Sequence, residues 1–201
     1  MKKLTAFFAF VAMLGLSASL FAETAPVMLS LVDPIQFPDN NVEVTGVRLN
    51  LIYGRSRSMT GATLGLANRT DREHIGGAFG FVHMNEDIFT GAQAGLLGFT
   101  RGNLTGADLS MVSICQRHVL GGQAGFVTMN DSLKGVQFGF LNFSKQIEGA
   151  QLGFVNLTHD IRGFQLGLFN YTKSMYGLQI GILNVIQDSD IPYMVIANAK
   201  F

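Results

Sequence analysis

Apolar and polar residues alternate with a period of two through most of the chain, and the alternation recurs every 14 or 15 residues. It is clearest in three segments of the form Gly-apolar-Gln-apolar-Gly-apolar-apolar-Asn, which begin at Gly149, Gly163 and Gly177. A period of two is typical of a β-strand, in which successive side chains point to opposite faces. A fixed repeat of this length indicates an architecture in which one short unit cannot bury its own apolar face and stacks on copies of itself.

Eleven such units follow one another to the end of the chain. They begin at Gly46, Gly61, Gly76, Gly91, Gly106, Gly121, Gly135, Gly149, Gly163, Gly177 and Ile191. With positions numbered from these residues, Gly occupies position 1 in ten units and position 5 in eight, while Gln at position 3 and Asn at position 8 each occur in six. Positions 4, 6 and 7 are mainly apolar, so the alternation slips between positions 6 and 7, as it does at a bend or bulge. Positions 10 to 12 are polar and predict turns.

Two all-β folds accommodate one strand and one turn per unit. The first is a parallel β-solenoid of about eleven 14–15-residue units. The second is an antiparallel outer-membrane β-barrel of about 12 strands, for which the strand length and the terminal Phe201 are suitable. Closing a barrel requires a net stagger of register, which uniform units do not accumulate. We therefore predict the solenoid and keep the barrel as the alternative.

In a parallel stack, like residues lie above like, and columns of Gln and Asn become ladders whose side-chain amides hydrogen-bond along the stack. The predicted ladder residues are Gln137, Gln151, Gln165 and Gln179 at position 3, Asn142, Asn156, Asn170 and Asn184 at position 8, and the glycines Gly139, Gly153, Gly167 and Gly181 at position 5. We expect the position-5 glycines to lie where neighbouring units approach too closely for a side chain.

The chain before the repeats divides into two parts. Residues 1–22 predict a secretory signal peptide, because Lys2 and Lys3 precede an apolar run that ends before Glu23. The run is also close to the length of an uncleaved membrane anchor, which is the alternative. Residues 23–45 contain three prolines and predict one strand at 28–32, turns at 34–38 and 39–41, and a cap for the repeat domain at 46–201.

Composition narrows the functional classes. Lys and Arg together equal Asp and Glu at 14 each, which gives no electrostatic reason to expect nucleic acid as a partner. The single Cys115 forms no internal disulfide and is expected to fill space. His74, His83, His118 and His159 fall at different repeat positions without metal-ligand spacing, so we expect them at the surface of turns. We predict no catalytic, cofactor-binding or metal-binding residues, and no enzyme activity.

The repeat resembles the Gly-Leu-Gln-Ile-Gly-type surface-repeat proteins of bacteria, most closely from Gly135 to Asn184. It departs from them in the early units, where position 3 is Arg48, Thr63, Ala78 or Asp108. The resemblance implies an exported protein of the cell surface or outer membrane of a Gram-negative bacterium, or of its periplasm, with a structural or interaction role and unknown partners, among which the outer membrane or other envelope components are candidates. The alternative function, which accompanies the barrel, is a pore or small transporter.

Overall fold

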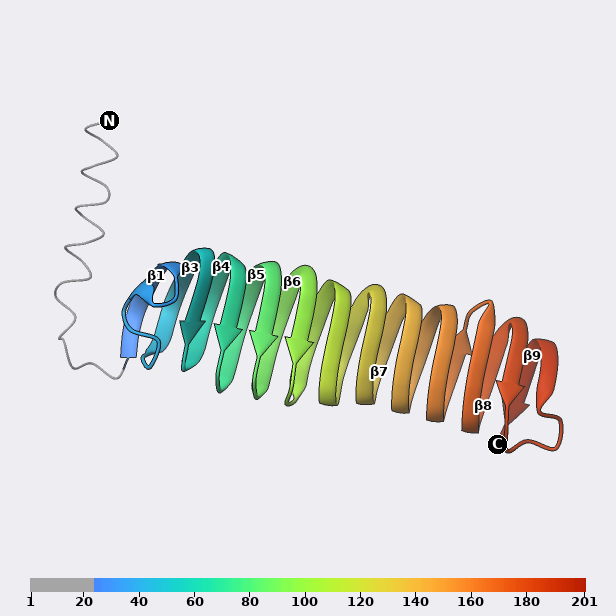
Figure 1. Cartoon of the computed structure of the whole chain (residues 1–201). Helices are drawn as coiled ribbons and strands as arrows, with labels where there is room; N and C mark the ends of the chain where they lie inside the picture. Colours follow the sequence, from blue (N-terminus) through green and yellow to red (C-terminus); the bar gives the residue numbers. More distant parts are fainter. Residues whose placement is uncertain (1–23) are drawn as a thin grey trace.

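A computed structural model describes residues 24–201 as a continuous stack of β-coils (Figure 1). The signal peptide predicted for residues 1–22 lies outside these residues. The strands are β1 (Thr24–Val32), β2 (Ile35–Phe37), β3 (Glu43–Ser56), β4 (Ser58–Thr70), β5 (Glu73–Asn85), β6 (Ile88–Thr100), β7 (Leu104–Leu166), β8 (Phe169–Ile186) and β9 (Tyr193–Lys200). The strand β7 is 63 residues long because it runs through several coils without a break. No helix that could span a membrane occurs in residues 24–201.

Successive coils pair in parallel, one repeat apart. Gly46 is paired with Gly61, and the same column continues through Gly76, Gly91 and Gly106, while Gly163 is paired with Gly177 near the other end. The parallel β-solenoid is therefore confirmed. The antiparallel barrel alternative is wrong.

Each coil turns a corner at its first glycine. The ten glycines at position 1, from Gly46 to Gly177, have φ angles between 121° and 149°. Residues other than glycine rarely adopt this backbone conformation, because their Cβ atom would meet the neighbouring backbone. The glycine column therefore sets the place at which every coil bends, and with it the register of the stack.

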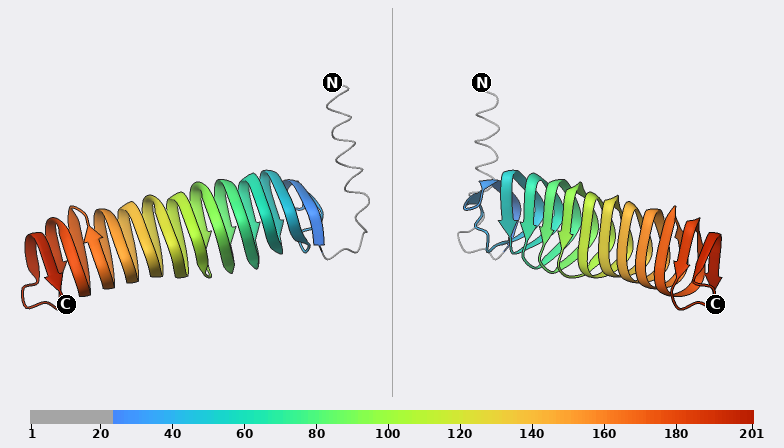
Figure 2. Two further views of the ribbon diagram at one scale, coloured as in Figure 1. Left: turned by 180° about the vertical axis from the view of Figure 1, so that it is seen from behind. Right: turned by 45° about the vertical axis from the view of Figure 1, so that its right-hand side comes forward.

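The two ends of the stack are closed by elements that break the repeat (Figures 1 and 2). At the first end β1 pairs in parallel with β3, and the short β2 pairs antiparallel with β1, so Ile35–Phe37 forms a strand where a turn is predicted. At the other end the predicted eleventh unit reverses direction, since β9 pairs antiparallel with β8. Elements that cover an open sheet edge remove unpaired backbone groups that would otherwise recruit other chains.

The interior of the coil is largely polar. The side chains at positions 3, 8 and 10 point inward and are mainly polar. The residues two places before the position-1 glycines form the one mainly apolar inner column of the described coils, which includes Phe89, Leu104, Ile147 and Ile161. Thr158 and Thr172 at position 10 are buried and lie within strands, so the turns predicted at positions 10 to 12 are wrong for the later units. Bends remain near positions 11 and 12 in the first four units, as at residues 71–72 and 86–87, and a turn follows at residues 187–188 in the unit that begins at Gly177.

Candidate functional site

The Gln column forms a hydrogen-bonded ladder through the last four coils. The Nε2 atom of Gln151 donates to Oε1 of Gln137 at 2.9 Å, that of Gln165 to Gln151 at 2.7 Å, and that of Gln179 to Gln165 at 2.6 Å. Thr158 Oγ1 at position 10 adds a second donor to Gln151 Oε1 at 2.7 Å. All four glutamines have no exposed surface. A polar interior of this kind is stable because each buried amide has hydrogen-bond partners within the stack.

The Asn column forms a second ladder parallel to the first. Asn142 Nδ2 donates to Asn156 Oδ1 at 2.8 Å, Asn156 to Asn170 at 2.7 Å, and Asn170 to Asn184 at 2.8 Å. Each of these three amides also donates to a backbone oxygen of the next coil, as Asn156 does to Leu166 at 2.9 Å. The ladder therefore ties side chains and backbone of adjacent coils together.

The position-5 glycines make room for the Asn ladder. A Cβ atom on Gly167 would lie 2.5 Å from Asn156 Nδ2 and 2.5 Å from the backbone oxygen of Gly153, and one on Gly139 would lie 2.7 Å from Asn142 Oδ1. Gly153 and Gly181 are equally crowded by the backbone oxygen of the preceding coil. These positions accept only glycine because the amide and the neighbouring backbone occupy the space of a side chain.

The early coils replace ladder amides by ionisable groups that are also buried. Arg48 is fully buried and donates to Ser56 Oγ at 2.7 Å and to the backbone oxygen of Arg69 at 3.0 Å, and burial lowers its pKa to about 10. Asp108 is fully buried and accepts from Ser110 and Ser113 hydroxyls at 2.5 and 2.7 Å. These partners compensate in part for the loss of water around each charge.

Two histidines lie inside the coil, which corrects the prediction that all four lie at turn surfaces. His83 takes the place of an Asn in the ladder, with Nε2 donating to the backbone oxygen of Ala94 at 3.0 Å and Nδ1 accepting from Asn68 Nδ2 at 3.3 Å. His74 occupies the inner apolar column and packs edge-on against Phe89. Burial, with the nearby charge of Arg48, lowers the pKa of His74 to about 3, and burial also lowers that of His83.

Cys115 occupies position 10 inside the coil, as a space-filling residue is expected to do. Its exposed fraction is 1%, and its thiol donates to the backbone oxygen of Gly102 at 3.3 Å. Burial raises the pKa of the thiol. A buried thiol with a raised pKa is chemically inert, because the thiolate is the nucleophile.

The outer surface of the strand segment at positions 2, 4 and 6 is wholly apolar, and we call it the apolar face. In the ten coils from Gly46 to Gly177, these thirty positions contain only aliphatic, aromatic, Met or Gly residues. Many of the large side chains are exposed; Phe79 is 67% exposed, and Phe138 is 60% exposed. At position 6, the rings of Phe126, Phe140 and Phe154 stack with centroid separations of 4.9 and 4.6 Å. A contiguous apolar surface of this size marks an interaction site on most proteins.

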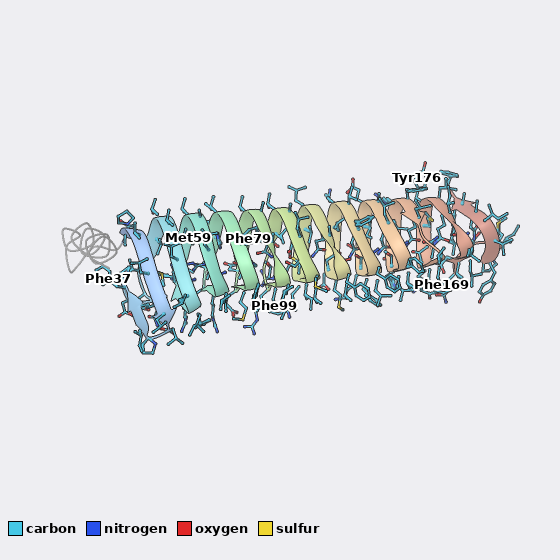
Figure 3. The ribbon with its side chains drawn as sticks, turned by 90° about the horizontal axis from the view of Figure 1, so that it is seen from above. Phe37, Met59, Phe79, Phe99, Phe169 and Tyr176 are labelled. Atoms are coloured by element: carbon cyan, nitrogen blue, oxygen red, sulfur yellow. The ribbon has the colours of Figure 1, made fainter. Side chains whose placement is uncertain are left out.

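The apolar character continues around the next corner of the coil. It includes position 7 in every coil and position 9 from the third coil to the tenth. Phe169 at position 7 and Phe99 at position 9 project on one side of the stack, whereas Tyr176 projects on the opposite side (Figure 3). Side chains on this second outer side are less exposed than those of the apolar face. Met129 is 40% exposed, and most of the others are half-buried by their neighbours in the column.

The charged residues are collected on the remaining side of the coil. Between residues 58 and 190, every charged residue except Arg69 and the buried Asp108 lies at positions 11 to 14. Opposite charges on adjacent coils pair with each other, as Lys145 does with Asp131 at 2.8 Å and Lys134 with Glu148 at 2.8 Å. The cross-section of the stack is therefore amphipathic, and its charged side carries seven basic and nine acidic residues between residues 58 and 190.

The described residues contain no candidate metal centre. In residues 24–201, no three His, Cys, Asp or Glu side chains are placed to hold a metal ion. A shallow groove of about 600 Å³ follows positions 9 to 11 past Met129, Phe143 and Leu157, and its rim carries Lys145 and Lys173. The apolar face is the larger and more uniform surface, and it is the candidate functional site.

A scan against family models, a search of curated proteins and a search of solved structures each found no match to the chain.

The sequence predicts the ladder residues and the apolar positions, but alternation assigns the apolar positions to neither side of the coil. The size of the side chains carries that information. The interior of a coil of 14 or 15 residues is already filled by the Gln column, the Asn column and the inner apolar column, so it cannot hold Phe79 or Phe138 as well. Large residues at positions 4 and 6 therefore have to point outward, and the face could have been found from this volume argument.

Proposed function

We propose that this chain is an exported protein of the bacterial cell envelope, at the cell surface, in the outer membrane or in the periplasm, and that it works as a structural and contact element without catalysing a reaction. The observation that carries the proposal is the apolar face, which runs along ten coils and is uninterrupted by charge. Exposed apolar surface of this extent is costly in water and is normally covered by a partner.

The use of the other side chains supports the same proposal. The polar groups of the interior hydrogen-bond to one another and hold the coils together. Several charges of positions 11 to 14 pair between neighbouring coils, as Lys145 does with Asp131 and Lys134 with Glu148. What remains for recognition is the apolar surface, and the positively charged, apolar start of the chain supports export to the compartment where that surface acts.

Cell fractionation tests the proposal. We expect the chain, detected by a tag after Phe201, in the envelope or periplasmic fraction of the bacterial host, with its N-terminus at or near Glu23 by mass spectrometry. A matched variant without residues 2–22 should stay in the cytoplasm. A retained N-terminal segment in the membrane fraction would indicate the anchor instead of the cleaved signal, and a full-length chain in the cytoplasm would contradict export.

A further inference from the structure

We propose that the apolar face binds a second copy of this chain, so that two stacks associate face to face into a dimer; this rests on the proposed function as a contact element and names its partner. The area of the face is sufficient. Ten coils at about 4.8 Å each and four residue steps at about 3.3 Å each, with the width of the outer side chains, give roughly 600–800 Å². A stable interface buries about 800 Å² on each partner.

The spacing of the ridges favours a second copy over an unrelated protein. Each coil adds one row of side chains to the face, so the rows recur at the distance between hydrogen-bonded strands. A partner with the same spacing keeps its rows in a constant register against those of the first stack along the whole length, as stacked identical sheets do. A partner with another spacing would lose this match after a few coils.

The two borders of the face are complementary to each other. Position 6 is large in all ten coils, whereas position 2 is small in six of them: Ala62, Gly77, Ala92, Ala107, Gly122 and Ala150. A two-fold axis along the stack places the large column of one copy over the small column of the other. Such a self-complementary contact is the usual form of a closed homodimer.

The distribution of charge favours a protein partner over a lipid bilayer. Elements that lie in a bilayer surface commonly carry Lys and Arg on the polar side and Trp at the border. This chain contains no Trp, its Lys and Arg equal its Asp and Glu, and acidic and basic residues are mixed at positions 11 to 14, where some of them pair between coils. Face-to-face association leaves these ion pairs in water. It buries no charge, because positions 2, 4 and 6 contain no charged residue.

Substitutions at two residues of nearly equal exposure test whether the apolar face or the second outer side forms the contact. Phe140 at position 6 is 41% exposed, and Met129 at position 9 is 40% exposed. Either one changed to Glu places a carboxylate on the surface of a single stack at a similar cost. Only Phe140→Glu places that carboxylate inside the proposed dimer, where an unpaired charge is strongly unfavourable. Phe138→Glu, at a site that is 60% exposed, is a second variant on the same face in case loss of the Phe140 ring stacking unfolds the chain.

Sedimentation velocity of the full chain, purified without detergent at micromolar concentration, is the test. We expect a dimer for the unaltered protein and for Met129→Glu, and a monomer with an unchanged circular dichroism spectrum for Phe140→Glu or Phe138→Glu.

A monomeric unaltered protein would overturn the dimer. So would an equal effect of the Met129, Phe138 and Phe140 variants on the sedimenting mass. A monomer that floats with neutral phosphatidylcholine vesicles, and does so less after either substitution, would identify a bilayer as the occupant. A monomer found in the envelope fraction would contradict the dimer and leave the proposed function intact. A dimer confined to the cytoplasm would support the dimer and contradict the proposed export.

Discussion

Replacing Gly167 by Val is expected to lower the free energy of unfolding by about 3–5 kcal/mol, the combined cost of overpacking and of broken buried hydrogen bonds. The Cβ atom alone would lie 2.5 Å from Asn156 Nδ2 and 2.9 Å from Asn170 Oδ1, which are the donor and the acceptor of one link of the Asn ladder, so that link would have to separate. The effect opposes the higher strand propensity of Val. Thermal unfolding should show a melting temperature lower by roughly 10 °C, at about 2–4 °C for each kcal/mol.

Gly77→Val is the matched control for this substitution. Gly77 lies at position 2 on the outer surface, and no heavy atom lies within 4 Å of a Cβ built there. The same chemical change should therefore leave stability within about 0.5 kcal/mol or raise it. Equal melting temperatures for the two variants would contradict the conclusion that the ladder requires glycine at position 5.

Acid is expected to destabilise the protein through His74, and His74→Met is expected to remove much of that effect. The ordinary pKa of His is 6.5, and burial beside Arg48 lowers that of His74 to about 3. Below pH 6.5 the unfolded chain therefore binds a proton that the folded chain does not bind. Stability is fully present above pH 6.5 and falls as the pH decreases toward 3. At pH 4 the loss from this one residue is about 3 kcal/mol.

Urea unfolding of the unaltered protein and of His74→Met between pH 7 and pH 4 measures the difference. Methionine suits the site because Met59 occupies the same inner column one coil earlier. At pH 7 the two proteins should be similarly stable, while at pH 4 the variant should be the more stable one. His118→Met, at an exposed site, should follow the unaltered protein. Identical pH profiles for all three proteins would show that His74 is not buried in its neutral form.

The fold could be predicted from the sequence because three of its determinants are strictly periodic. The position-1 glycines recur at one place in every unit, the Gln and Asn columns mark residues that can form ladders along a stack, and the constant unit length is compatible with parallel stacking. The two ladders of Gln137 to Gln179 and Asn142 to Asn184 follow from these regularities, since amides in register can hydrogen-bond only if like residues lie above like.

The features that could not be predicted are those that the period does not encode. Alternation separates two faces but does not say which one is inside, and only the width of the coil assigns the large apolar residues to the outside. Thr158 and Thr172 have the polarity of turn residues, yet their hydroxyls complete the inner hydrogen bonds. His83 replaces an Asn because its ring also donates and accepts along the stack. The reversal of β9 depends on pairing at the end of the stack, which local pattern does not report.

The separation of Leu157 and Tyr171 tests the parallel coil most directly. These position-9 residues are direct partners in the pairing of β7 and β8. Spin labels on cysteines at both positions, with Cys115 changed to Ser, should show the strong dipolar broadening of backbones about 5 Å apart. Labels at Phe143 and Tyr171, two coils apart, should report about 10 Å between backbones. A separation near 30 Å for Leu157 and Tyr171, the length of a strand of nine or ten residues, would mean that successive units run antiparallel and would contradict the solenoid.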